Sequence, residues 1–163
     1  MTTDTNTHDV VVTQRYSDRH HGDANGATIH SVVITSQVAG QKGIERQLQL
    51  EVTQPQKVNG AKTTMTVRRI LSWEELEQLG AVADRLVSAA ETWRSTPNPR
   101  RSSIEFSTTV ADGFAIGRQM SNQGPEYFVA LRDEGQTARC VLGGVEQLNE
   151  FVAHLLDAAL QLR

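Results

Sequence analysis

The chain has 163 residues, of which 38% are hydrophobic and 21% charged, and its formal net charge is −3. These values exclude a chain that is disordered throughout and a strongly basic polyanion binder, so any nucleic-acid site has to be a local cluster of positive charge. The single cysteine, Cys140, excludes an intramolecular disulfide framework and a multi-cysteine zinc site.

Residues 1–9 are polar, without the basic start and apolar segment of a secretory signal, and we expect a flexible tail. The sequence nowhere contains a run of about 18 apolar residues, which argues against a transmembrane helix. We therefore expect a soluble, cytoplasmic protein with no membrane partner.

Runs of β-forming residues separated by turn residues predict four strands in the first half, at 10–16, 28–39, 44–53 and 61–71. A polar loop is expected over 17–27, and a glycine-containing turn over 40–43. The pair Asn59-Gly60 is typical of a two-residue hairpin turn, so it joins the third strand to the fourth.

This hairpin turn predicts a register. If Val58 pairs with Ala61, counting back places Val52 opposite Val67, Leu48 opposite Leu71, and Glu51 opposite Arg68. The apolar pairs then share one face, and Ile44 and Leu50 belong to the same inward set.

The same register places Arg46 and Arg69 on the inward face. We expect them either to extend their charged ends past its rim or to pair with a helix carboxylate such as Glu75.

Two segments have helical periodicity, at 73–93 and 145–162. Ser72 precedes the first and Glu75 follows three residues later, which is the pattern of a capping box. Pro97 and Pro99 end the region that can be helical.

The second half predicts four further strands, at 102–111, 114–121, 126–132 and 137–142. Asp112-Gly113 is another hairpin signal. With a strict two-residue turn there, the apolar side chains of the preceding strand would lie on one face of the sheet, and the other face would carry Phe114, Ile116, Arg118 and Met120. Either a bulge restores the register, or that second face is partly apolar, aromatic and basic.

The order of elements predicts an α+β fold of two ββββα repeats, at 10–93 and 102–163, joined by a linker at 94–101. We expect two antiparallel sheets, each packed on the helix that follows it. Because neither sheet can cover its apolar face alone, the repeats should share one core in a single pseudo-twofold domain over 10–163.

Side chains that could carry chemistry are few. The segment Asp18-Arg19-His20-His21-Gly22-Asp23, with His8 and His30 nearby, could ligate a metal, but adjacent histidines usually point apart, and a flexible polar loop is the better interpretation. Cys140 lies in an apolar strand and is expected to be a buried, inert thiol. No catalytic motif can be assembled, so we expect neither an enzyme nor a metal or cofactor.

The densest positive charge is Arg100-Arg101 in the linker. A basic stripe would form if these residues lay near Lys57, Lys62, Arg118, Arg132 and Arg139. Acidic residues of the same region would turn that stripe into a mixed surface (Glu105, Glu126, Asp133 and Glu134). The sequence leaves both alternatives open.

The turns Asn59-Gly60 and Asp112-Gly113 and the helices at 73–93 and 145–162 set an element order across residues 10–162. This order resembles that of the Whirly and purine-rich-element-binding (PUR) families, which are single-stranded nucleic-acid-binding regulators. The resemblance implies exposed sheet surfaces that bind single strands and helices that mediate packing and oligomerisation. It lies in element order alone, so no binding residue is assigned by motif.

The first hypothesis is thus a non-enzymatic single-stranded DNA or RNA binder. In it Phe114 and Tyr127 stack on bases, and four arginines contact phosphates: Arg118, Arg132, Arg100 and Arg101. The alternative is a protein-interaction or structural module on the same scaffold, with a protein partner or a second copy of the chain. An enzyme or small-ligand site around Arg46 and Arg69 is the third hypothesis.

Overall fold

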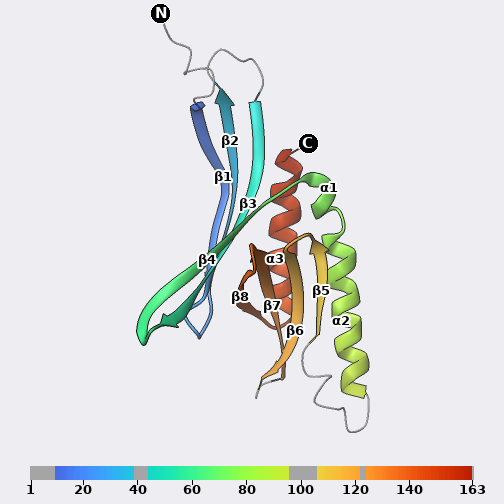
Figure 1. Cartoon of the computed structure of the whole chain (residues 1–163). Helices are drawn as coiled ribbons and strands as arrows, with labels where there is room; N and C mark the ends of the chain where they lie inside the picture. Colours follow the sequence, from blue (N-terminus) through green and yellow to red (C-terminus); the bar gives the residue numbers. More distant parts are fainter. Residues whose placement is uncertain (1–9, 39–43, 96–105, 122–123, 163) are drawn as a thin grey trace, which may run out of the picture.

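The computed structural model describes residues 10–38, 44–95, 106–121 and 124–162. Two four-stranded antiparallel sheets occupy these residues, each with its strands in chain order (Figure 1). The first sheet contains β1 (Val10–Gly22), β2 (Thr28–Val38), β3 (Ile44–Val58) and β4 (Ala61–Leu71). The second contains β5 (Phe106–Ala111), β6 (Phe114–Ser121), β7 (Gly124–Asp133) and β8 (Gln136–Gly143).

The helices are α1 (Trp73–Leu76), α2 (Leu79–Ser95) and α3 (Val145–Ala159), and the 3-10 turn η3 (Leu160–Leu162) continues α3. The structure therefore confirms an α+β fold with a repeated ββββ layout. The expected tail at 1–9, the turn at 40–43 and most of the linker lie outside the described residues.

The first sheet is more extensive than the sequence predicts. β1 continues to Gly22, so the loop expected over 17–27 is wrong for residues 17–22. A register shift between Tyr16 and Arg19 keeps β1 paired with β2, and these polar residues thereby find backbone partners that the sequence pattern does not reveal. β3 likewise runs five residues beyond the expected end, to Val58.

The helix predicted at 73–93 is interrupted at Glu77 and Gln78, between α1 and α2. Its capping box is confirmed: the Glu75 amide donates to Ser72 Oγ at 3.2 Å, and the Ser72 amide donates to Glu75 Oε1 at 3.0 Å. Leu76 and Leu79 are fully buried on either side of the break. Because Glu and Gln are good helix formers, the two residues at the interruption do not themselves mark it.

The predicted register of the first hairpin is confirmed at every pair named above, from Val58–Ala61 down to Leu48–Leu71. Asn59 and Gly60 have φ values of 53° and 80°, as a type I′ turn requires. Glu51 and Arg68 face each other and form an ion pair. Leu48, Leu50 and Val52 are buried, as expected for the inward face.

The second hairpin contains the bulge. Ala111 pairs with Phe114 and Thr109 pairs with Ala115, so Val110 is the extra residue. The bulge brings Val110, Phe114 and Ile116 into the core together. The alternative in which Phe114 and Ile116 lie on an exposed face is therefore wrong.

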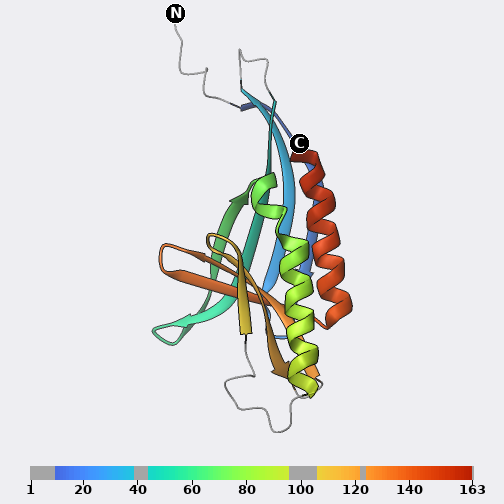
Figure 2. The ribbon, with the colours of Figure 1, turned by 90° about the vertical axis from the view of Figure 1, so that its right-hand side faces the viewer.

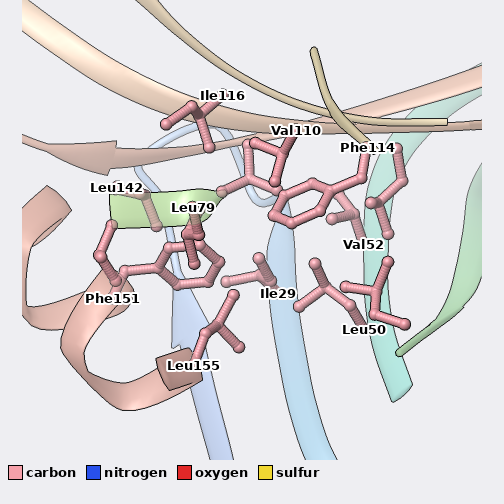
Figure 3. Packing of buried hydrophobic residues seen from close by; sticks show 14 of the residues in the cluster. Ile29, Leu50, Val52, Leu79, Val110, Phe114, Ile116, Leu142, Phe151 and Leu155 are labelled. Atoms are coloured by element: carbon pink, nitrogen blue, oxygen red, sulfur yellow. The ribbon is translucent and has the colours of Figure 1, made fainter. Parts of the chain in front are cut away.

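A hydrophobic cluster takes side chains from both sheets and from the helices (Figure 3). In this view Leu50 and Val52 of the first sheet approach Phe114 of the second, while Phe151 and Leu155 of α3 close the cluster. Burial of each such side chain contributes roughly 1.5–3 kcal/mol. Helix α2 follows the first sheet but contacts β5 and β6 of the second, whereas α3 contacts strands of both.

The edge of β8 is held against the first sheet by three side chains. The Arg139 amide donates to Gln54 Oε1 at 2.8 Å, and the Val141 amide donates to Asp23 Oδ2 at 2.9 Å. His21 Nε2 donates to the Val141 carbonyl at 3.0 Å. These bonds satisfy an otherwise open strand edge and fix the position of Arg139 relative to the first sheet.

Candidate functional site

Three of the side chains assigned to nucleic-acid contact are buried. Phe114 is 1% exposed, and Arg118 and Tyr127 are each 3% exposed. The bulge at Val110 turns this face of β6 inward, and Tyr127 is the direct partner of Arg118 on β7. A side chain enclosed in this way cannot stack on a base or reach a phosphate, so these assignments are not compatible with the structure.

The other basic residues that the sequence suggests as contacts do not lie together on one surface of the described residues. Arg132 is exposed near the end of β7, whereas Arg100 and Arg101 lie outside the described residues. Lys57 and Lys62 are on the β3–β4 hairpin, and neither lines the surface on which Arg132 lies. The described residues thus do not assemble the single basic stripe that the sequence left open.

An open groove of about 590 Å³ crosses the face of the second sheet that points away from the hydrophobic cluster. Its floor is made of small side chains from all four strands of that sheet: Ser107, Thr109, Ala115, Ala130 and Thr137. Because these side chains are short, the sheet surface is hollow there.

Within the groove, the ring of Phe128 contacts both a glycine and an arginine. Its ring covers Gly117, its direct partner on β6, so closely that a Cβ at residue 117 would collide with the ring. The guanidinium carbon of Arg139 lies 3.8 Å from the centroid of the same ring, and Arg139 Nη1 donates to Gln119 Oε1 at 3.1 Å. Arg139 is therefore held in place by a cation–π contact and a hydrogen bond.

The charges of the groove come from distant parts of the chain. Among the described residues, three arginines line it, from β4, β7 and β8 (Arg69, Arg132 and Arg139), and three carboxylates lie beside them (Asp112, Asp133 and Glu134).

Arg69 approaches Asp112, with Nη2 and Oδ2 separated by 3.9 Å, rather than the helix carboxylate that was one predicted partner. Gly113 makes room for it, because a Cβ there would lie 3.1 Å from Arg69 Nε. Arg46 is exposed and lines a different hollow, next to Trp73, so the structure does not bring Arg46 and Arg69 into one site.

Sequence reasoning missed Phe128 and Arg69 as parts of this surface. One signal was present, because a glycine inside a strand often marks a close approach by another group, and Gly117 accommodates the ring of Phe128. No local sequence pattern indicates that Arg69, which belongs to the first sheet, lies beside the second sheet.

The remaining chemistry-bearing residues have structural partners. Asp23 accepts hydrogen bonds from the amides of Asn25, Ala27 and Val141, and the rings of His20 and His30 stack at 3.9 Å. In the part of the chain that the structure describes, no group of three or more His, Cys, Asp or Glu side chains is arranged to hold a metal ion.

His154 Nε2 and Ser31 Oγ are 3.0 Å apart, joining α3 to β2. Burial, reinforced by the negative charge of Asp23, raises the pKa of the Cys140 thiol to about 12.

No protein-family model matches the sequence, and no curated protein matches it significantly. Within residues 10–38, 44–95, 106–121 and 124–162, no helix combines the length and apolar character needed to cross a membrane.

Proposed function

We propose that the protein is a non-enzymatic binding protein for single-stranded nucleic acid, and that the groove of the second sheet receives a short stretch of the strand. The observation that supports this most is the convergence of Arg69, Arg132 and Arg139 on one open hollow. A single strand is flexible enough to enter such a groove and presents one negative charge per nucleotide.

The stacked pair of Arg139 and Phe128 offers more than charge. A guanidinium is planar, and single-stranded nucleic acids are recognised by stacking of their bases on aromatic rings and on arginine planes. Arg139 is already held over Phe128 and by Gln119, so little side-chain entropy is lost when a base stacks on its outer face. Arg132, which is exposed, is the natural phosphate contact beside it.

The resemblance to the Whirly and PUR families supports the same proposal, since it is a resemblance of fold plan to single-strand-binding regulators. In this proposal the two ββββ sheets and their helices are pseudo-twofold repeats, each sheet packed on a helix, and the protein acts in the regulation of transcription. Helix α2 belongs to the first repeat but contacts β5 and β6 of the second, so it joins the two repeats.

A second candidate is a protein-interaction module. The equal numbers of arginines and carboxylates around the groove favour it, because a balanced surface suits a protein partner better than a polyanion. Its partner would carry both signs of charge.

The two candidates differ in how binding responds to salt. Fluorescence polarisation with a labelled 20-nucleotide single-stranded DNA should show binding at 50 mM NaCl that weakens steeply as salt is raised. The variant Arg132→Gln should lower the slope of log affinity against log salt by about 0.7, the value for one phosphate contact on a single strand. Arg85→Gln, which removes an exposed charge from α2, is the matched control and should leave the slope unchanged.

Absence of binding by the wild type at 50 mM NaCl, or binding without salt dependence, would contradict the proposal and leave the interaction module as the better candidate. Equal effects of Arg132→Gln and Arg85→Gln would show that binding occurs away from the groove.

A further inference from the structure

The tip of the β3–β4 hairpin projects from the rest of the molecule. Figure 1 shows it extending past the neighbouring strands, and in Figure 2 it points to the same side of the molecule as the β7–β8 hairpin. We refer to residues 53–66 as the β-arm. Every residue from Lys57 to Thr64 is exposed, including Val58, whose exposed fraction of 50% is high for an apolar side chain.

The composition of the β-arm contrasts with that of the whole chain. It has two lysines and no Asp or Glu, in a protein whose formal net charge is −3. Its other polar side chains are hydroxyls and amides: Thr53, Gln54, Gln56, Asn59, Thr63, Thr64 and Thr66. These are side chains that donate hydrogen bonds to phosphate and sugar oxygens without adding negative charge.

The two lysines are placed directly opposite each other. Lys57 pairs with Lys62 in the ladder, two positions further along each strand than Pro55 and Thr64. Directly opposite side chains have Cβ atoms about 4.5–5.5 Å apart, and like charges at this spacing destabilise a hairpin. Lower on the same face, Glu51 and Arg68 show the favourable arrangement, an ion pair of opposite charges.

A like-charged pair on an exposed ribbon becomes favourable when a polyanion lies against it. The base of the β-arm is fixed, because the Gln54 side chain binds the Arg139 amide and the hydroxyls of Thr53 and Thr66 are 2.8 Å apart. Two-stranded ribbons of this kind are used by several proteins to contact nucleic acid.

We propose that the β-arm is a second contact for the nucleic acid, in which Lys57 and Lys62 bind neighbouring phosphates of the backbone. This inference rests on the proposed function, but it assigns a site separate from the groove, which neither lysine lines. It also explains why a positively charged tip lies on an acidic protein.

The experiment compares Lys57→Gln/Lys62→Gln with the wild type in the same polarisation assay. Loss of two phosphate contacts should lower the salt slope by about 1.4 and weaken binding roughly tenfold or more at 50 mM NaCl. Lys57→Arg/Lys62→Arg keeps both charges and should retain the wild-type slope. Arg46→Gln/Arg85→Gln removes two exposed charges elsewhere and should change neither quantity.

The outcomes separate the two proposals. If the wild type binds the oligonucleotide and the double glutamine variant binds with the same slope, the β-arm has no role, although the proposed function stands. If the wild type does not bind, the proposed function itself fails.

A third outcome would assign the β-arm to a second copy of the chain, whose acidic turn at Asp133 and Glu134 has the complementary charge. In that case sedimentation would show a dimer that the double glutamine variant loses, while its oligonucleotide binding stays unchanged. That result would also overturn the inference.

Discussion

The sequence marks two hairpins, β3–β4 and β5–β6, with a two-residue turn signal, and their turns and surroundings differ. Asn59 and Gly60 both have positive φ, whereas at Asp112-Gly113 only the glycine does. Gly60 and Gly113 have φ values of 80° and 75°. A Cβ at Gly60 would meet nothing within 4 Å, whereas one at Gly113 would collide with the Arg132 carbonyl and press on Arg69. The regular hairpin has the turn in which both residues are left-handed, whereas the bulge at Val110 accompanies the turn in which only the glycine is left-handed and the packing is close.

The largest expected effect comes from Gly113→Ala. The left-handed backbone costs an alanine about 1–2 kcal/mol, and overpacking against a carbonyl and a half-buried arginine adds about 1–3 kcal/mol. We therefore expect the free energy of unfolding to fall by about 3 kcal/mol, measured by urea denaturation. The collision involves backbone on both sides, so side-chain rotation cannot relieve it.

Gly60→Ala is the matched variant for this comparison. It carries the same backbone strain in open space, and its cost should be only about 1–2 kcal/mol. Equal losses for the two variants would show that backbone strain alone determines the cost, and the contrast between the two hairpins would then have no energetic consequence.

The same comparison shows what the sequence could predict. Asn59-Gly60 predicts the register from Leu48–Leu71 to Val58–Ala61 correctly, because its two-residue turn leaves β3 and β4 paired without a shift. At Asp112-Gly113 the sequence left two registers open, since choosing between them requires knowing that Phe114 packs into the shared core. The polar stretch of β1 was missed for a similar reason, because its stabilising contacts are with β2 and β8.

The candidate site was harder to predict than the fold. The groove combines Arg69 of the first sheet with residues of the second, and no local pattern encodes this approach. The sequence hypothesis places Phe114 and Tyr127 on the surface, but a core with few large residues also uses aromatic side chains to fill its volume, and both are buried. Residue type alone could not distinguish the two uses.

The burial of Cys140 in β8 of the second sheet can be tested through the pH dependence of stability. Below pH 9 the thiol is protonated in both the folded and the unfolded chain, so it has no effect on pH dependence. Burial raises the folded-state pKa of this thiol from 9.0 to about 12, so between these values only the unfolded chain releases the proton. The free energy of unfolding should then fall as pH rises, by at most about 1.4 kcal/mol per pH unit.

Urea denaturation of the wild type and of Cys140→Ala at pH 8 and pH 10.5 isolates this contribution, because the other titrating groups are common to both proteins. Between pH 8 and pH 10.5 the free energy of unfolding of the wild type should fall more than that of Cys140→Ala. If the two proteins differed in unfolding free energy by the same amount at both pH values, solvent would reach Cys140 between β8 and the first sheet. Cys140 would then titrate as it does in the unfolded chain.

The smallest expected effect on stability is in the β3–β4 hairpin, where a substitution should raise the free energy of unfolding instead of lowering it. Lys57→Glu replaces the like-charged pair with Lys62 by a pair of opposite charges on an exposed surface, which should raise the free energy of unfolding by about 0.2–1 kcal/mol. The same change should weaken oligonucleotide binding at 50 mM NaCl, because it removes a phosphate contact and adds a repulsive charge. Thermal denaturation and polarisation on one sample measure both quantities.

A gain in stability together with a loss of affinity is what a site maintained for binding at the expense of folding produces. Arg85→Glu on α2 makes the same change of charge away from the β-arm and should leave affinity nearly unaffected. If Lys57→Glu stabilised the protein without weakening binding, Lys57 and Lys62 would be an unfavourable pair with no ligand, and the groove of the second sheet would have to account for binding by itself.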